Sequence, residues 1–253
     1  MKRIEYGKEN EKVILLLHGG GLSCWNYREV AEHLKNEYHV VIPILDGHAN
    51  SDRDFTSIEA NAREIISYID ENFGGNVTMI GGLSLGGQIL VEVLSQRADI
   101  CKSALVESAL IFPMEMTHSM VQPMMDMSYG LIKQEWFAKL QFASLKMKPE
   151  LYVEYYRDTC KISKENMTAF LKANSAYEVK DTLGATEAKV HICVGQREQG
   201  IMIRSARKLH ELIPSSTLEV LPKLYHGEYS INHAKEYADK VRELVEDLGK
   251  IVS

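Results

Sequence analysis

Residues 77–87 read VTMIGGLSLGG, and this stretch decides the fold of the chain. The apolar run Val77 to Ile80 predicts a buried strand, and apolar residues at helical spacing further on predict a helix. Between them, the pattern Gly82-x-Ser84-x-Gly86 predicts a sharp turn on which a serine is presented as a nucleophile, with glycines where strand and helix crowd together. The unpaired N–H groups at the start of the helix then face any negative charge that develops beside Ser84.

A second glycine cluster, His18-Gly19-Gly20-Gly21, directly follows the apolar run Val13 to Leu17. Acyl transfer builds negative charge on a carbonyl oxygen, and backbone N–H groups near glycines can approach that oxygen closely. We expect the N–H groups of Gly20 and Leu85 to form this oxyanion hole, with Gly21 as an alternative to Gly20. The competing interpretation is a flexible loop that carries a structural histidine.

In this order the two motifs resemble the α/β-hydrolase superfamily. His18-Gly19-Gly20-Gly21 is similar to its oxyanion loop, and Gly82-Leu83-Ser84-Leu85-Gly86-Gly87 to its nucleophile elbow. Asp46-Gly47-His48-Ala49-Asn50-Ser51 is similar to another of its loops, although it is shorter and has Ala49 where glycine is usual. The resemblance implies an α/β fold with a mostly parallel sheet, helices on both faces and a helical cap insertion.

The resemblance also implies a catalytic triad in the chain order serine, acid, histidine. The acid of this superfamily, usually Asp, comes three residues after a glycine that ends a strand. Here Gly195 follows the predicted strand Lys189 to Val194, and Glu198 stands in the acid position. His226 lies in the loop between the last predicted strand, Thr217 to Leu221, and a helix predicted near 232–250, and is the predicted general base.

The acid has rivals. Glu198 could instead be a surface carboxylate paired with Arg197 or Arg204. Glu107 ends the predicted strand Ala104 to Val106, where some members of the superfamily carry the acid, and Asp126 follows it.

Earlier in the chain, a strand is predicted over 40–44 and a helix over 58–73, so strands and helices alternate. Residues 113–181 interrupt this alternation. They contain no convincing strand, and helices are predicted over 131–146, 150–160 and 164–177. We expect them to form the cap, with residues 1–112 and 182–253 as the hydrolase core. Methionines in the first part of this segment either line an adaptable apolar pocket or pack the cap onto the core; they are Met114, Met116, Met120, Met124, Met125 and Met127. Aromatic residues of the same segment favour an acyl or aryl group over a sugar or phosphate; they are Trp136, Phe137, Phe142, Tyr152, Tyr155 and Tyr156.

Composition narrows the function further. The 253 residues suit one α/β domain with an insertion, and 45% hydrophobic with 25% charged residues is ordinary for a globular protein. A net charge of −6 with no basic cluster argues against nucleic acid or an anionic membrane as partner. Four widely spaced cysteines indicate thiols rather than a metal site or disulfides, and neither a signal peptide nor a membrane span is evident. We therefore expect a cytoplasmic protein; the sequence leaves its oligomeric state open.

These features predict a serine hydrolase that cleaves a small to medium, largely apolar carboxylic ester or thioester through an acyl-enzyme on Ser84. No metal or organic cofactor is implied, because protein groups supply the nucleophile, base and oxyanion donors. One alternative is another chemistry of the superfamily, such as a C–C bond hydrolase, amidase, lyase or cofactor-free haloperoxidase. The other is a protein that binds a small ligand with little turnover.

Overall fold

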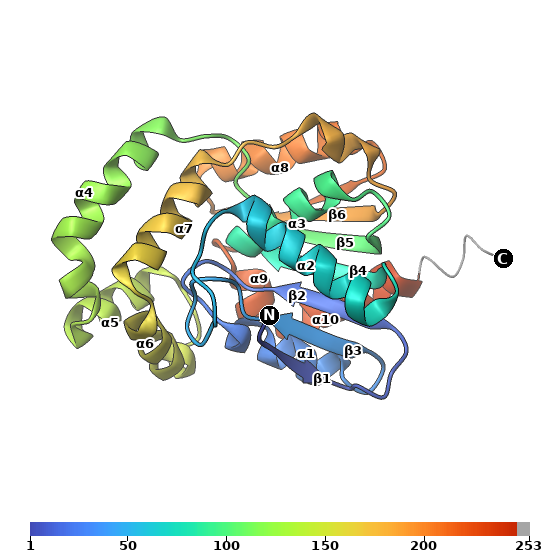
Figure 1. Cartoon of the computed structure of the whole chain (residues 1–253), viewed down its shortest axis with the longest axis horizontal. Helices are drawn as coiled ribbons and strands as arrows, with labels where there is room; N and C mark the ends of the chain where they lie inside the picture. Colours follow the sequence, from blue (N-terminus) through green and yellow to red (C-terminus); the bar gives the residue numbers. More distant parts are fainter. Residues whose placement is uncertain (247–253) are drawn as a thin grey trace.

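The computed structural model describes residues 1–246 and is built around one seven-stranded sheet (Figure 1). The strands lie in the order β1-β3-β2-β4-β5-β6-β7. Only the β1–β3 pair is antiparallel; the other five pairs are parallel. The strands are β1 (Arg3–Tyr6), β2 (Val13–Leu17), β3 (His39–Pro43), β4 (Val77–Leu83), β5 (Cys101–Glu107), β6 (Lys189–Gly195) and β7 (Thr217–Leu221). The predicted α/β fold with a mostly parallel sheet is confirmed.

Helices cover both faces of the sheet. The α-helices outside the segment between β5 and β6 are α1 (Arg28–Leu34), α2 (Ile58–Phe73), α3 (Leu85–Gln96), α8 (Gly200–Leu212), α9 (Glu228–Asn232) and α10 (Ala234–Glu246). Short 3-10 helices are η1 (Cys24–Tyr27), η2 (Pro149–Leu151) and η3 (Asp181–Ala185). No helix among residues 1–246 has the length and apolar character needed to cross a bilayer.

The side chains of β2 show how the sheet separates two cores. All five of its residues are buried. Leu15 and Leu17 pack into the core formed with α2, α3 and α8, whereas Ile14 and Leu16 pack into the core formed with α1 and α10. Successive side chains of a strand point to opposite faces, so a continuous apolar run fits a strand that is covered on both sides.

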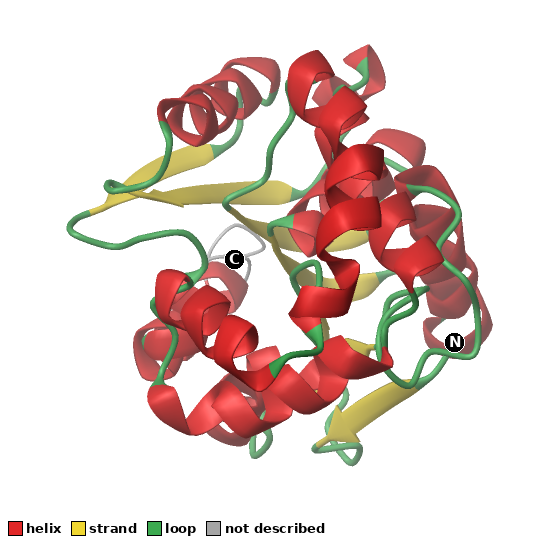
Figure 2. Cartoon of the chain, turned by 90° about the vertical axis from the view of Figure 1, so that its left-hand side faces the viewer, coloured by secondary structure: helices red, strands yellow, loops and turns green. Residues whose placement is uncertain are grey.

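Four α-helices stand beyond one end of the sheet, at the left of Figure 1, and Figure 2 views them from the front. They are α4 (Glu115–Ile132), α5 (Glu135–Ser144), α6 (Tyr152–Lys161) and α7 (Lys164–Ala176), and all lie between β5 and β6 in the sequence. Hydrogen bonds join them to the rest of the chain: Gln88 on α3 donates to Asn174 O and accepts from Asn174 Nδ2. The indole of Trp25 donates to the buried carboxylate of Asp158.

The helix boundaries differ from the sequence prediction chiefly over residues 115–146 and at the C-terminal helix. Residues 131–146 were expected to form one helix, but α4 ends at Ile132 and α5 begins at Glu135. The prediction also missed most of α4, because Pro123 lies inside it and interrupts the helical pattern. The C-terminal helix was expected over 232–250; α10 begins at Ala234, and residues beyond Glu246 lie outside the described part of the chain.

Two glycines provide a matched test of this packing. A Cβ on Gly86 would lie 2.1 Å from the carbonyl oxygen of Leu17, whereas a Cβ on Gly130, inside α4, would meet no atom within 4 Å. Gly86→Ala is expected to lower the free energy of unfolding by about 3 kcal/mol or more, because backbone must move to admit the methyl group. Gly130→Ala is expected to raise it by about 0.5–1 kcal/mol through helix propensity. Thermal unfolding followed by circular dichroism measures both, and equal melting temperatures for the two variants would contradict the packing described.

Candidate active site

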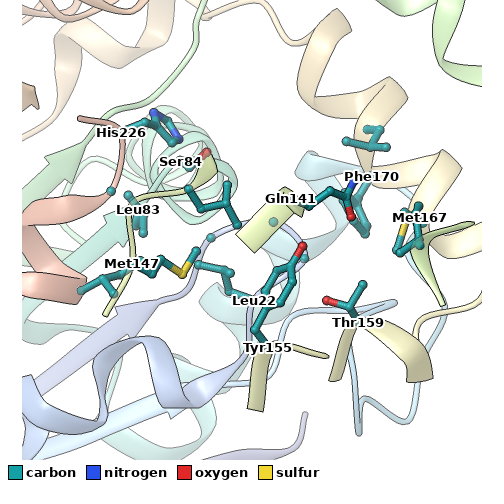
Figure 3. Close-up of a pocket in the computed structure, with 18 of the residues that line it drawn as sticks. Leu22, Leu83, Ser84, Gln141, Met147, Tyr155, Thr159, Met167, Phe170 and His226 are labelled. Atoms are coloured by element: carbon teal, nitrogen blue, oxygen red, sulfur yellow. The ribbon is translucent and has the colours of Figure 1, made fainter. Parts of the chain in front are cut away.

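Ser84 lies at the junction of β4 and α3 in a backbone conformation that residues other than glycine rarely adopt. Its φ is 54° and its ψ is −113°. The N–H of Ser84 donates to the carbonyl oxygen of Glu107 over 2.9 Å, which holds the turn against the neighbouring strand β5. A Cβ on Gly82 would lie 2.4 Å from the carbonyl oxygen of Gly86, so strand and helix can meet at this angle only with glycine there. The junction presents Ser84 at the wall of a cavity (Figure 3).

Glu198 and His226 form a hydrogen-bonded pair next to this junction. The Nδ1 atom of His226 lies 2.7 Å from Oε2 of Glu198, whose side chain is only 1% exposed. The other carboxylate oxygen, Oε1, accepts hydrogen bonds of 2.6 Å from Ser108 Oγ and from Gly195 N–H. Burial alone would raise the pKa of Glu198, but the hydrogen bond and charge of His226 with the bonds from Ser108 and Gly195 lower it below the usual value. Glu198 is thus an ionised carboxylate that holds the Nδ1 edge of the imidazole ring.

Ser84 and His226 line the same cavity and lie next to each other in Figure 3. Among the described residues, no hydrogen bond joins Ser84 Oγ to His226. Contacts between a nucleophile and its base are commonly long in free enzymes and tighten when substrate binds.

The side chain of Glu107, the rival acid, bonds to α9 and not to His226 within the described residues. Its side chain is buried, and Oε1 accepts a 3.3 Å hydrogen bond from the N–H of Ser230 on α9, while Oε2 has no protein partner within the described chain. Burial, reinforced by the charge of Glu198 and opposed by Ser230 and His226, raises the pKa of Glu107 to about 7. Asp126, the other rival, is on α4 and pairs with Lys164.

The candidate oxyanion donors are close together. The position of a Cβ on Gly20 would lie 3.4 Å from the Cβ atom of Leu85, so the glycine loop and the start of α3 are in contact. Leu85 begins α3, where an N–H has no partner within the helix. No hydrogen bond occupies the N–H groups of Gly20, Gly21 or Leu85 among residues 1–246, whereas that of Gly19 donates to Asn26 Oδ1. Gly20 and Gly21 both line the cavity, so both are candidates for the second donor of the oxyanion hole.

His18 shapes this loop rather than reacting. Its Nε2 accepts from the N–H of Leu45 over 3.2 Å, so the ring proton is on Nδ1, which donates to Gly19 O over 2.9 Å. Complete burial, together with nearby His48, lowers the pKa of His18 to about 3. The neutral ring therefore links the glycine loop to the loop that carries Leu45. His18 thus has a structural role, as the competing interpretation of this motif proposed.

The Asp46–Ser51 loop supports the wall of the cavity that α7 forms. The imidazole of His48 stacks on the ring of Phe170, with centroids 4.8 Å apart, and Phe170 lines the cavity from α7. Asn166 on the same helix accepts from the N–H of Phe55 and donates to Asp54. These contacts tie the core loop to α7.

The cavity has a volume of about 530 Å³, and most of its lining is apolar. Met124 and Met125 from α4 line it with Phe137 and Tyr155, so part of the methionine prediction agrees with the structure. Met116, Met120 and Met127 do not line the cavity and are 82%, 56% and 83% exposed. No Asp, Glu, Lys or Arg is among the lining residues.

Within residues 1–246, no cluster of three or more His, Cys, Asp or Glu side chains could hold a metal ion. The four cysteines are free thiols.

Sequence comparison places the chain among hydrolases. A model of the alpha/beta hydrolase family matches residues 14–240. No curated protein sequence gives a significant match.

Solved structures with similar folds cover nearly the whole chain. The chain is similar to a thermophilic esterase from Thermogutta terrifontis, with a TM-score of 0.80, 17% identity, and coverage of 97% of this chain and 93% of the other. A structure reported in a study of carboxylesterases from Nitrososphaera gargenis has a TM-score of 0.80 and 19% identity, with 98% and 95% covered. A bromoperoxidase from Bacillus anthracis has a TM-score of 0.81 and 15% identity, with 96% and 94% covered.

At these identities the likeness concerns the fold alone. The match of the family model over most of the chain shows more, and with the strand–serine–helix junction it leads to one conclusion: this chain belongs to the alpha/beta hydrolase family.

Proposed function

We propose that the protein is a serine hydrolase that cleaves an uncharged, largely apolar carboxylic ester or thioester through an acyl-enzyme on Ser84. The observation that carries the proposal is the 2.7 Å pair between His226 Nδ1 and the buried Glu198, next to a serine that lines the same apolar cavity. In addition, esterases are among the proteins with a similar fold.

The reaction would proceed in two halves. In the first, Ser84 Oγ attacks the carbonyl carbon while its proton passes to Nε2 of His226, and the N–H groups of Leu85 and of Gly20 or Gly21 stabilise the oxyanion. Collapse of the tetrahedral intermediate breaks the bond to the leaving group, which takes the proton from Nε2. In the second, His226 removes a proton from water, hydroxide attacks the acyl-enzyme, and Ser84 regains its proton as the acid leaves.

Glu198 would keep His226 in the productive tautomer. An ionised carboxylate at Nδ1 fixes the proton there, so Nε2 is free to accept the proton of Ser84. The carboxylate also stabilises the imidazolium that forms during each half-reaction. Ser108 and Gly195 would act through Glu198, because their hydrogen bonds favour its charged form.

The cavity supports an uncharged substrate. Burying an unpaired charge in an apolar site is costly, and the lining offers no ionic partner. Residues 113–181 contribute most of the apolar wall, and we propose that they act as a cap that limits the access of water to Ser84. Four free thiols are consistent with a reducing compartment such as the cytoplasm.

Labelling with a fluorophosphonate probe tests the nucleophile. We expect stoichiometric modification at Ser84, located by peptide mass spectrometry, and hydrolysis of p-nitrophenyl esters by the unmodified protein. Ser84→Ala should abolish both, since it removes the oxygen on which the acyl-enzyme forms. Full turnover by folded Ser84→Ala protein would refute the mechanism.

Replacing the two carboxylates in turn tests the acid. Glu198→Gln is expected to lower kcat/KM for a p-nitrophenyl ester by about 10³–10⁴-fold, because an amide neither fixes the tautomer nor stabilises the imidazolium. Glu107→Gln is the matched control, because its side-chain oxygen can still accept from Ser230, and we expect a change below about tenfold. The opposite ranking would assign the acid to Glu107.

The raised pKa of Glu107 has a measurable effect on stability. Between pH 4.5, its ordinary pKa, and about pH 7, its pKa in the folded protein, the unfolded chain loses this proton while the native state keeps it. Wild-type protein should therefore lose stability relative to Glu107→Gln as pH rises through this window, and the difference should level off above it. Chemical denaturation at a series of pH values measures the difference, with Glu115→Gln on the exposed surface as the control for loss of one charge. A difference that is constant with pH would show that Glu107 is not neutral in the native state.

A further inference from the structure

Besides Ser84, three hydroxyl side chains line the cavity, and the proposed reaction uses none of them. Ser128 donates to the carbonyl oxygen of Met124 over 2.7 Å; the other two are Tyr155 and Thr159. Tyr155 and Thr159 both line the cavity from α6, and their side chains are 7% and 5% exposed. Neither hydroxyl makes a hydrogen bond of good geometry within the described residues, and Thr159 Oγ1 is buried as well as unpartnered. Buried polar groups in proteins nearly always have a partner, so each exception requires an explanation.

Neighbouring tyrosines on the same helix show the contrast. Tyr156 donates its hydroxyl to the carbonyl oxygen of Lys133 over 2.7 Å, and Tyr152 donates to Glu135 O over 3.2 Å. Neither of these two lines the cavity. Tyr155 instead packs its ring against Phe142 and directs its hydroxyl into the cavity (Figure 3).

Tyr155 and Thr159 are neighbours one helical turn apart. Burial raises the pKa of Tyr155, and the adjacent Thr159 hydroxyl opposes part of this rise. The two hydroxyls are therefore close enough to interact with each other. Figure 3 shows this pair across the cavity from Ser84 and His226.

We propose that Tyr155 and Thr159 form a subsite that binds a neutral oxygen atom of the substrate, such as a ketone or hydroxyl oxygen, away from the bond that is cleaved. The tyrosine O–H donates to that oxygen, and the Thr159 hydroxyl, which is buried beside it, orients the tyrosine oxygen. A neutral oxygen fits because the lining residues include no charged side chain other than His226 when that ring is protonated. The substrate class is then an oxygenated acyl ester rather than a plain fatty ester. This inference rests on the proposed function, in which the ester is cleaved at Ser84.

The physical basis is discrimination by a polar group in an apolar site. A plain chain leaves the Tyr155 hydroxyl without a partner and removes it from water, whereas an oxygenated chain satisfies it. One neutral hydrogen bond corresponds to about a tenfold change in affinity or in kcat/KM.

The test compares p-nitrophenyl alkanoates with p-nitrophenyl oxoalkanoates of equal length, in which the ketone is moved along the chain. We expect kcat/KM to be about tenfold higher for one ketone position than for the plain ester. Tyr155→Phe should bring the ratio of the two kcat/KM values close to one, and Thr159→Val should reduce it. Tyr156→Phe, which removes a hydroxyl from the same helix outside the cavity, should leave the ratio unchanged.

A binding measurement separates this inference from the proposed function. Ser84→Ala protein, alone and combined with Tyr155→Phe, is titrated with the same ester pairs by calorimetry. Tighter binding of the oxoalkanoate that is lost in the double variant supports the subsite even if wild-type protein hydrolyses neither ester. Turnover of plain and oxygenated esters with equal kcat/KM at every ketone position, unchanged by Tyr155→Phe or Thr159→Val, would overturn the subsite and leave the hydrolase proposal intact.

Discussion

The structure depends on two places where backbone meets backbone with no room for a side chain. Gly86 on α3 lies against the carbonyl oxygen of Leu17, and Gly82 on β4 against that of Gly86. These approaches fix the angle between strand and helix and leave Ser84 with a φ of 54°. A conformation of this kind costs about 1–3 kcal/mol and persists only where the surroundings hold it. Here the almost entirely buried helix α3 and the bond from Ser84 N–H to strand β5 do so.

Local patterns in the sequence were sufficient for most of the fold. The helix predicted over 58–73 coincides with α2, since Ser57 caps its start and Gly74 follows its end in the left-handed conformation. Two elements escaped. Strand β1 has exposed or half-buried side chains, and its place is set by backbone pairing with β3. Helix α4 has Pro123 in its interior and its five methionines on several faces, so its periodicity is weak.

The candidate site also contains residues that the sequence indicated and residues that it did not. Ser84, Glu198 and His226 could be named from the sequence because each follows a predicted strand in a known order, and the sheet gathers such positions at one edge. The groups that support them could not. Ser108 bonds Glu198 across 90 residues, and Ser230 bonds Glu107 across 123, so neither spacing carries a signal. His18 was recognised within a motif, but its fixed tautomer depends on Leu45 from another loop.

The exposed methionines of α4 also determine where oxidants act first. Thioethers at Met116 and Met127 are open to peroxide, while Met125 in the cavity wall is almost fully covered. Conversion to sulfoxide makes an apolar side chain polar, which disrupts cores but is tolerated at a surface already in water. Damage to α4 is therefore expected first at Met116 and Met127, next at the half-exposed Met124, and last at Met125.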